Sequence, residues 1–271
     1  MSGSGPIAAL PMYDFPEIAA ANDALWGAIA ARLKAHGVEA PAKLTRGEDI
    51  AALWSDPGLV FGQTCGYPYA KALSDAVVLI ATPEYALPGC EGASYRSFLV
   101  RATDDPRRSL GAFRGGVAAV NALDSNSGMN LFRASIAPLA GGSPFFSAVV
   151  VTGAHHASLE AVAAGRAHLA AIDCVTFGLI KRLRPALVER VAVVAESPPS
   201  PGLPFVASAA LPASTVAAVR DALSAALADP ALAGARAALG LKGAGVTTPA
   251  DYERVLDIER GAATAGYPRL E

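Results

Sequence analysis

The sequence predicts an α/β fold with mainly parallel sheets, on two observations. Short apolar runs of strand length alternate with longer segments of helical periodicity almost from end to end, which is typical of repeated βα units. The chain has 271 residues, of which 52% are hydrophobic, so it can bury a large core in one domain or two lobes. A small scaffold held together by disulfides or metal is therefore excluded.

The first βα unit shows the pattern on which the other elements are predicted. Residues 7–12 form an apolar run of strand length, and a helix is expected to follow. The apolar positions of that helix recur at helical spacing and are Ile18, Leu25, Ile29 and Leu33. Gly37 follows directly, and a glycine just past the last apolar position is a typical helix stop.

The remaining elements follow from the same two criteria, apolar runs for strands and helical spacing for helices. In the first half, strands are expected at 42–45, 59–62 and 77–81, an extended segment at 95–101, and a short helix at 47–54. In the middle, strands are expected at 117–120, 145–151 and 169–172, a turn at 124–128, and helices at 130–139, 158–164 and 175–183. At the end, strands are expected at 191–195 and 205–208 and helices at 214–228, 230–239 and 249–263.

Two breaks in this alternation predict a division into lobes. One is the polar segment 103–106, and the other is the proline-rich segment 196–204. Two breaks roughly ninety residues apart bracket a block that is long enough to form an inserted lobe. The alternative is a single doubly wound domain with one proline-rich surface loop.

The predicted first lobe is discontinuous, comprising residues 1–101 and 202–271, and the second is residues 102–195. The chain would cross between them at about 100–106 and 194–204. Two extended crossovers of this kind make a hinge.

Charge and hydrophobic patterning exclude two classes of partner. The 22 Lys and Arg residues nearly balance 24 Asp and Glu, for a formal net charge of -2, and they are scattered along the chain. Nucleic acid is therefore not an expected partner. No apolar run reaches the roughly 18 residues that a membrane-spanning helix needs, so we expect no direct membrane insertion.

The three cysteines leave the compartment open. Cys65 and Cys90 are hypothesised to form a disulfide, with Cys174 left free. No cluster of Cys and His has the spacing of a zinc site, and we expect neither a metal nor a cofactor. The first residues lack the basic and apolar regions of a secretion signal, which predicts a cytosolic protein or one that starts at a mature N-terminus.

Three predicted strand-to-helix junctions carry small polar residues: Thr64-Cys-Gly-Tyr67, Asp124-Ser-Asn-Ser-Gly128 and Thr152-Gly-Ala-His155. Free N–H groups and the helix dipole attract anions at such positions. In parallel α/β sheets these junctions lie at the carboxyl ends of strands, where ligands bind. Each junction taken singly also fits an ordinary N-cap.

The second junction is the best anion-site candidate. Ser125, Asn126 and Ser127 are consecutive, and Gly128 permits close backbone approach. The chain carries no Walker-type phosphate-binding sequence, so phosphoryl transfer is not indicated.

His155 and Asp173 are further candidates near this junction. A neutral imidazole at a helix N-terminus can donate a hydrogen bond to an oxyanion. Asp173 ends a predicted strand and is placed to meet a ligand cation, although an Asp there is also a common helix N-cap.

Five groups of residues, in this order, resemble a known family. They are Leu10-Pro-Met-Tyr-Asp14; Gln63-Thr-Cys-Gly-Tyr-Pro68; Gly89-Cys-Glu-Gly92 with Tyr95-Arg-Ser97; Asp124-Ser-Asn-Ser-Gly128; and Thr152-Gly-Ala-His155 through Ala171-Ile-Asp173. The chain resembles the phosphate, phosphite and phosphonate substrate-binding proteins of ABC transporters. That resemblance implies a type II periplasmic-binding-protein fold, with two α/β lobes that close on a ligand in the cleft.

The resemblance also implies roles for individual residues. Ser125, Asn126, Ser127 and His155 map onto the oxyanion-binding role, and Asp173 and Glu91 are candidates for a ligand amine. The aromatic positions implied for the first-lobe side are Tyr13, Tyr67 and Tyr95. Thr64, from the first of the three strand-to-helix junctions, completes the predicted ligand-binding set.

The function that the resemblance implies is capture of a small oxyanion, such as a phosphonate, phosphite or phosphate. The ligand would pass to the membrane subunits of an ABC transporter, which implies a periplasmic location, with a cytoplasmic one as the alternative. No catalytic residue is expected. One alternative is an enzyme on the same fold, with Cys65 as nucleophile and His155 as base. Another is a cytosolic ligand sensor.

Overall fold

The computed structural model describes residues 5–47 and 49–271. Residues 1–4, at the start of the predicted first lobe and of the segment considered for a secretion signal, lie outside the described residues. So does Glu48, one residue of the predicted 47–54 helix.

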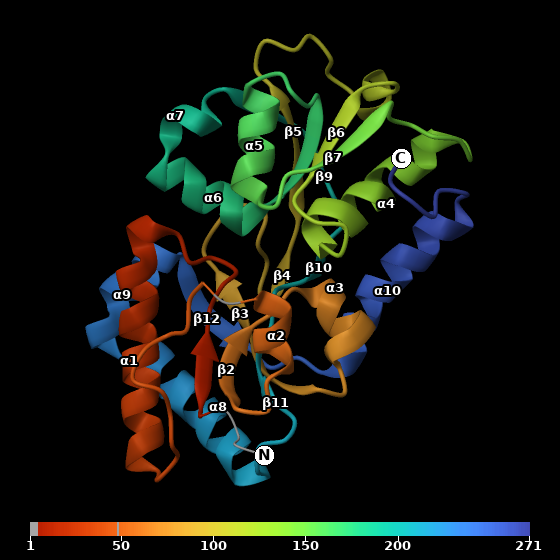
Figure 1. The fold of residues 1–271 in the computed structure, drawn as a ribbon. Coiled ribbons are helices and arrows are strands. Elements are labelled where there is room, and N and C mark those ends of the chain that lie inside the picture. Colours follow the sequence, from red (N-terminus) through yellow and green to blue (C-terminus); the bar gives the residue numbers. More distant parts are fainter. Residues whose placement is uncertain (1–4, 48) are drawn as a thin grey trace. The chain divides into compact units, whose positions relative to one another are not determined.

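The described chain divides into two compact units (Figure 1). Unit 1 comprises Met1–Ala86 and Gly202–Asp251, and unit 2 comprises Leu87–Pro201 and Tyr252–Glu271. The chain therefore passes from one unit to the other three times, after Ala86, Pro201 and Asp251.

Unit 1 is built on a five-stranded mixed sheet of order β1-β2-β11-β3-β12. The strands are β1 (Ile7–Ala9), β2 (Leu59–Gln63), β3 (Val77–Tyr85), β11 (Phe205–Ser208) and β12 (Leu241–Gly245). β1 and β2 pair in parallel, whereas β11 runs antiparallel to both β2 and β3, and β12 runs antiparallel to β3. All five residues of β2 are buried, as expected of a strand in the interior of a sheet.

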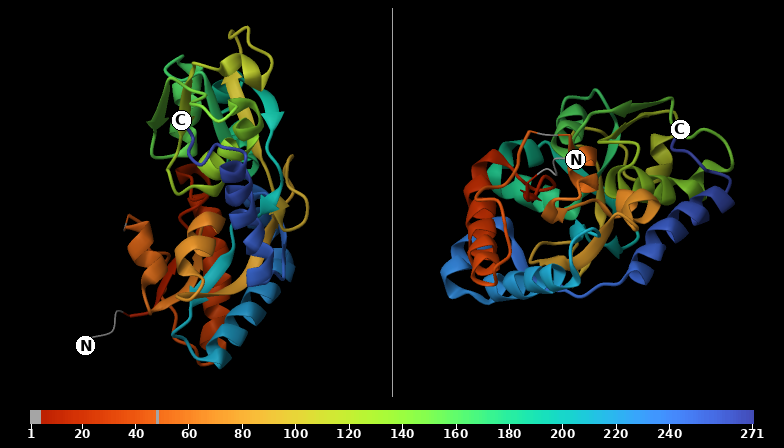
Figure 2. Two further views of the ribbon diagram at one scale, coloured as in Figure 1. Left: turned by 90° about the vertical axis from the view of Figure 1, so that its right-hand side faces the viewer. Right: turned by 60° about the horizontal axis from the view of Figure 1, so that its bottom comes forward.

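Helices from both ends of the sequence pack together in unit 1. They are α1 (Ala19–Ala35), α8 (Ala213–Ala228) and α9 (Ala233–Leu239), and α1 lies beside both others (Figures 1 and 2). The apolar stripe of α1 is buried, and its Trp26 lies 5.9 Å from Phe61 of β2, ring centre to ring centre. The shorter helices of this unit are η1 (Pro16–Ile18), α2 (Ile50–Ser55), α3 (Gly66–Pro68), η2 (Tyr69–Leu73) and η5 (Pro230–Leu232).

Unit 2 has its own five-stranded mixed sheet, of order β7-β6-β8-β5-β9. The strands are β5 (Ser97–Ala102), β6 (Val117–Val120), β7 (Ala148–Val151), β8 (Leu169–Asp173) and β9 (Val191–Glu196). β6 pairs in parallel with β7 and β8, whereas β5 runs antiparallel to β8 and β9. A separate two-stranded ladder joins β4 (Ser94–Tyr95) to β10 (Ser200–Pro201).

The helices of unit 2 follow its strands. They are η3 (Leu110–Phe113), η4 (Asn126–Asn130), α4 (Leu131–Ala140), α5 (His155–Ala163), α6 (Cys174–Leu183) and α7 (Pro185–Val188). The last helix, α10 (Pro249–Thr264), begins in unit 1 and ends in unit 2. Its Ala262, and Tyr267 beyond it, belong to the same buried cluster as Phe132, Phe145 and Phe146.

The predicted α/β class is confirmed, but several elements differ from the prediction. Residues 42–45 form no strand, and residues 241–245, which were not predicted as a strand, form β12. Leu44 is buried although it lies outside any strand. Its apolar side chain therefore produced a strand-like pattern in the sequence without strand pairing in the structure. The sheets are mixed rather than mainly parallel, because strands such as β11 and β5 run against their neighbours.

The division into units also differs from the predicted lobes. Residues 87–101 and 252–271, predicted for the first lobe, belong to unit 2. β5 lies mostly within the first of these ranges and pairs with β8 and β9 of the second sheet. Helical periodicity showed that α10 is a helix but carried no information about which core it would join.

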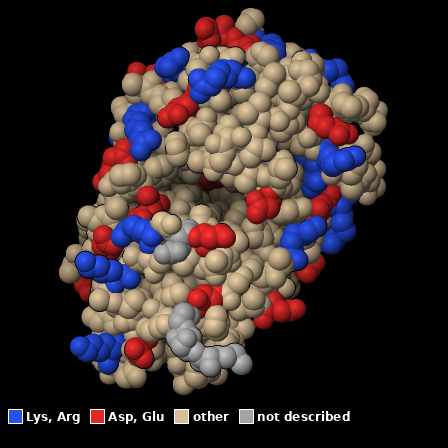
Figure 3. Space-filling view, viewed as in Figure 1, with Lys and Arg blue, Asp and Glu red and all other residues tan. Residues whose placement is uncertain are grey.

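The distribution of surface charge and the apolar character of the helices relate to the two excluded partners, nucleic acid and the membrane. On the face shown in Figure 3, basic and acidic side chains are interspersed rather than gathered by sign. Within residues 5–47 and 49–271, no helix combines the length and the apolar character needed to cross a bilayer.

Candidate functional site

The candidate anion site lies at one edge of the unit 2 sheet. β6, β7 and β8 are mutually parallel, so their carboxyl ends reach the same edge. The turn at Ser125 follows β6, His155 follows β7, and Asp173 ends β8. The sheet therefore brings together three predicted site segments that are far apart in the sequence.

The turn after β6 is a π-helical segment, η4, held by short-range hydrogen bonds. The Ser125 hydroxyl accepts from the Gly128 N–H at 3.0 Å, and the Asn130 N–H donates to the Ser125 carbonyl at 3.0 Å. The Ser97 hydroxyl, from β5, donates to the Ser127 carbonyl at 3.0 Å. Ser125 is thus an N-cap, as the alternative interpretation of this junction expected.

Both polar atoms of the Asn126 side-chain amide form hydrogen bonds within the protein. Its Nδ2 donates to the Tyr95 hydroxyl at 3.1 Å and to Ser200 Oγ at 2.8 Å. Its Oδ1 accepts from Asn130 Nδ2 at 3.0 Å. The Asn126 side chain therefore fixes the turn to the β4–β10 ladder. Tyr95 lies in unit 2, and not on the first-lobe side that the resemblance implied.

Ser127, His155 and Asp173 form a connected polar chain. Ser127 Oγ lies 2.9 Å from His155 Nε2, and His155 Nε2 lies 3.4 Å from Asp173 Oδ2. The other carboxylate oxygen, Oδ1, accepts from the Thr176 N–H at 2.8 Å and so caps α6. Asp173 therefore fills the N-cap role and also faces His155.

Burial lowers the pKa of His155 below its ordinary value. The Asp173 carboxylate and the Ala171 backbone oppose this effect by favouring the charged imidazolium, and neighbouring His156 adds to it. His155 is accordingly neutral near pH 7 and is a hydrogen-bonding group without a full charge. It opens α5, a helix that has no side-chain cap at Ala154, so nearby first-turn N–H groups are not taken up by a cap.

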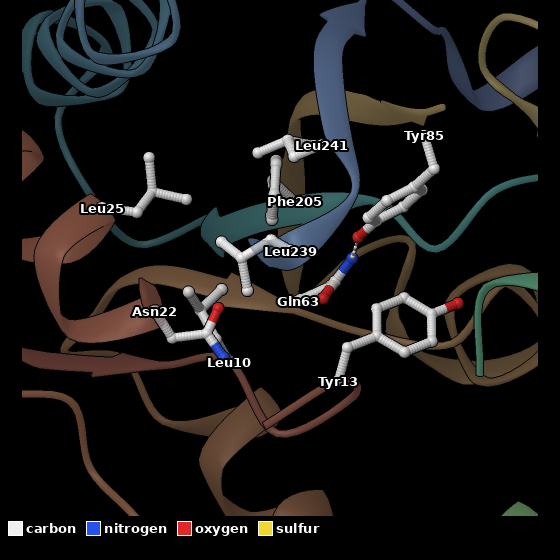
Figure 4. Close-up of a pocket in the computed structure, with 9 residues that line it drawn as sticks. All are labelled: Leu10, Tyr13, Asn22, Leu25, Gln63, Tyr85, Phe205, Leu239 and Leu241. Atoms are coloured by element: carbon white, nitrogen blue, oxygen red, sulfur yellow. Dashed lines mark hydrogen bonds between the residues drawn. The ribbon is translucent and has the colours of Figure 1, made fainter. Parts of the chain in front are cut away.

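Unit 1 presents a second group of candidates, in a pocket at the carboxyl ends of β1 and β2 (Figure 4). The rings of Tyr13 and Tyr85 meet edge to face, with centres 5.5 Å apart. Gln63 Nε2 donates to the Tyr85 hydroxyl at 3.4 Å and to the Leu203 carbonyl at 3.1 Å. The other lining residues are mostly apolar and are Leu10, Asn22, Leu25, Phe205, Leu239 and Leu241.

Three other predicted site residues lie outside these two groups. Thr64 is fully buried in unit 1, where its hydroxyl donates to the Cys65 carbonyl at 3.3 Å. Tyr67 is buried in α3 and has the Lys71 ammonium 5.4 Å from its ring centre. Glu91 is exposed in unit 2, in a tight turn where its N–H donates to the Ser94 carbonyl at 3.0 Å.

Several residues of these groups were not among the predicted site residues. Tyr85 ends a long strand and carries no local motif. Ser97 and Ser200 gain their roles only through strand pairing. Gln63 stood within one of the family-like segments, and that position was the one available signal.

The hypothesised Cys65–Cys90 disulfide is absent, because none of the three cysteines forms a disulfide in the structure. Cys65 lies in unit 1, and Cys90 in unit 2 faces Cys174, with the two sulfurs 3.3 Å apart. Sequence separation gave no means of choosing between the two partners.

Comparison with known proteins identifies the family. A model of the periplasmic phosphonate substrate-binding proteins of ABC transporters matches residues 8–252. The chain belongs to this family. The predicted resemblance is thus confirmed, and the protein is a substrate-binding protein of the phosphonate-binding family. Comparison with curated protein sequences finds no match.

Solved structures show the same fold at low sequence identity. A binding-protein component of a phosphonate ABC transporter from Pseudomonas aeruginosa has a TM-score of 0.75 at 14% identity, covering 97% of this chain and 88% of that one. PhnD1 from Prochlorococcus marinus, in complex with methylphosphonate, has a TM-score of 0.74 at 14% identity, with coverage of 94% and 97%. XAC2383 from Xanthomonas citri, bound to ATP, has a TM-score of 0.72 at 14% identity, with coverage of 97% and 98%.

These matches confirm the type II periplasmic-binding-protein fold. The phosphonate-binding family consists of binding proteins, which favours a noncatalytic role over the Cys65 enzyme. It is also a family of ABC-transporter components and of periplasmic proteins.

Proposed function

We propose that this protein binds a phosphonate in the periplasm and delivers it to the membrane subunits of an ABC transporter. Family membership supports the class of ligand, and the Ser127–His155 pair supports the place where the oxyanion binds. That pair is the single observation that carries the assignment, since it presents two neutral polar groups beside the start of an uncapped helix.

The oxyanion is bound by unit 2 in this proposal. Ser127 and His155 contact the phosphonate oxygens, together with first-turn N–H groups of α5. Neutral donors and the positive end of a helix stabilise an anion without a buried cation, and they bind most strongly where water is excluded. Asn126, Ser125 and Asp173 hold this arrangement in place through the contacts described above.

The pocket of unit 1, taken by itself, has a lining that an organic group fits. The pocket of Figure 4 offers aromatic rings and apolar side chains, with Gln63 and Tyr85 as polar groups. Such a lining suits a carbon substituent better than a fourth phosphate oxygen, because most of its side chains are apolar and cannot donate to an additional anionic oxygen. We therefore expect a preference for phosphonates over inorganic phosphate. Contact of Asp173 or Glu91 with a ligand amine stays a prediction. The predicted hinge segment 100–106 lies within unit 2, whereas the segment 194–204 contains the passage between units after Pro201.

A thermal-shift panel tests the ligand class directly. The compounds are methylphosphonate, aminoethylphosphonate, phosphite, phosphate and sulfate. At one hundred times its dissociation constant a ligand stabilises the folded state by about 2.7 kcal/mol, and for a chain of this size we expect a shift of several degrees. Selective shifts with phosphonates support the proposal. Equal shifts with all five anions, or none with any, would contradict it.

Ser127→Ala tests the proposed oxyanion contact. A hydrogen bond to a charged group contributes about 1.5–3 kcal/mol, so calorimetry should show the dissociation constant of the best phosphonate rising roughly 10- to 100-fold. Ser143→Ala is the matched control, since its hydroxyl lies in the same unit and donates only to the Ala140 carbonyl. Unchanged affinity in Ser127→Ala would place the oxyanion elsewhere.

A further inference from the structure

The geometry of unit 2 points to a disulfide-forming site that is separate from the ligand-binding residues. We propose that Cys90 and Cys174 are oxidised to an intramolecular disulfide by thiol–disulfide exchange with an oxidised partner. The oxidised partner is a disulfide, either in another protein or in a small molecule such as oxidised glutathione.

The two thiols already lie in contact. Their sulfurs are 3.3 Å apart although the residues are 84 positions apart in the sequence. Cys174 opens α6 and is completely buried, and its N–H donates to the Arg96 carbonyl at 2.9 Å. Cys90 is partly exposed in the segment before β4, where its N–H donates to the Leu87 carbonyl at 3.1 Å. Both backbones are thus held where a small side-chain rotation brings the sulfurs to bonding distance.

Gly89 accounts for the close approach of these segments. A Cβ at this position would lie 2.7 Å from Cys174 Cβ and 2.9 Å from a ring carbon of Phe98. Its φ of 88° is also in the left-handed region that favours glycine. Only a residue without a side chain lets the Cys90 segment pack directly onto the start of α6.

The different exposure of the two thiols sets the order of the reaction. The Cys90 thiolate attacks the partner disulfide, forming a mixed disulfide and releasing one partner thiolate. Cys174 then attacks the Cys90 sulfur while its proton passes to the departing partner sulfur, which leaves as the second partner thiol. The net change converts two protein thiols and one partner disulfide into one protein disulfide and two partner thiols. The burial that hinders Cys174 as the first nucleophile does not hinder it as the resolving thiol, because Cys90 is adjacent.

The disulfide would fasten the Gly89–Cys90 segment to the first residue of α6. Asp173, which caps that helix and faces His155, precedes Cys174 directly. Oxidation therefore restrains the backbone next to the Ser127–His155–Asp173 chain without consuming any of its polar groups.

Thiol counting after unfolding tests the proposal on the intact protein. The protein is incubated with oxidised glutathione or with reductant, quenched in acid, unfolded and alkylated. We expect one reactive thiol, Cys65, after oxidation and three after reduction, and a linked pair of peptides containing Cys90 and Cys174. The closed loop is long, so we also expect the oxidised protein to melt several degrees higher.

Two variants make the assignment specific. Cys65→Ser should leave no reactive thiol after oxidation, whereas Cys90→Ser should keep both of its thiols reactive and show no shift in melting temperature. Three reactive thiols after oxidation would overturn the proposal. So would a glutathione adduct that persists on Cys90, or a cross-link through Cys65.

Discussion

At the scale of single residues, the candidate site depends on which polar groups already form hydrogen bonds within the protein. Asn126 uses its amide to hold Tyr95, Ser200 and Asn130. Asp173 divides its two oxygens between the cap of α6 and His155. Ser127 lies in the first turn of η4 and His155 begins α5, and the two side chains contact each other, which is why the proposed oxyanion site is built on them. The sequence named these residue types, and their contacts distinguish the residues proposed to bind the ligand from those proposed to position them.

The lowered pKa of His155 predicts a loss of stability in mild acid. An unfolded histidine titrates near pH 6.5, whereas the buried imidazole titrates lower. Between those two values the unfolded state binds more protons, so the free energy of unfolding falls as the pH falls from about 6.5. Urea unfolding at pH 8, 7, 6 and 5 should show this loss in the wild type and less of it in His155→Gln. His36→Gln, which replaces an exposed histidine, is the control variant. Identical stability profiles for His155→Gln and the wild type would contradict the prediction.

At the scale of elements, the turn after β6 is the most specialised feature of unit 2. It combines a serine cap, a π-helical turn and a glycine against which another side chain packs. A Cβ on Gly128 would lie 1.8 Å from Asn121 Oδ1 and 3.1 Å from His155 Cε1. The turn therefore needs glycine for space, and not for an unusual backbone angle, since Gly128 is not among the positive-φ residues.

Gly128→Ala should destabilise the protein by about 1–3 kcal/mol, the usual range for overpacking. Asn121→Ala in the same chain should recover part of that loss, because it removes the atom nearest the new methyl group. Gly111→Ala is the control in the same unit, since a Cβ at that position would meet open space. The free energies come from denaturant unfolding, and equal stability of the Gly128 and Gly111 variants would show that the turn has room for a side chain.

At the scale of the whole molecule, the C-terminal segment belongs to unit 2. Tyr267 is 2% exposed, and its hydroxyl donates to the Glu271 carbonyl. That carbonyl also accepts the N–H groups of Phe145 and Phe146 at 2.6 and 3.1 Å. Arg133 Nη1 donates to the Pro268 carbonyl at 2.7 Å. The end of the chain thus completes the core of the unit that carries the candidate anion site.

Tyr267→Ala should therefore weaken unit 2 selectively, by about 3–5 kcal/mol as for other buried aromatic residues. Hydrogen exchange should accelerate in β6 and α4, while β2 and β3 of unit 1 keep their protection. Leu223→Ala, which removes a buried side chain of α8 in unit 1, should give the reverse pattern. Faster exchange of β2 and β3 in Tyr267→Ala would instead place the C-terminal segment with unit 1.

Local signals determined much about this protein. Strands β6 and β11 have the predicted bounds, and helix α8 differs by one residue, because apolar period and turn residues act over a few positions. The α/β class and the family also followed from the sequence, and so did the polar junctions after β6, β7 and β8. The family-like segments remain recognisable because each keeps its residue types within a short stretch.

Tertiary structure alone decided the partners of these segments. It paired Cys90 with Cys174, placed Tyr95 beside Asn126, and assigned residues 87–101 and 252–271 to unit 2. It also brought Ser127, His155 and Asp173 into one chain across three strands. The physical reason is that periodicity reports which face of an element is buried, whereas strand order and packing decide against what it is buried.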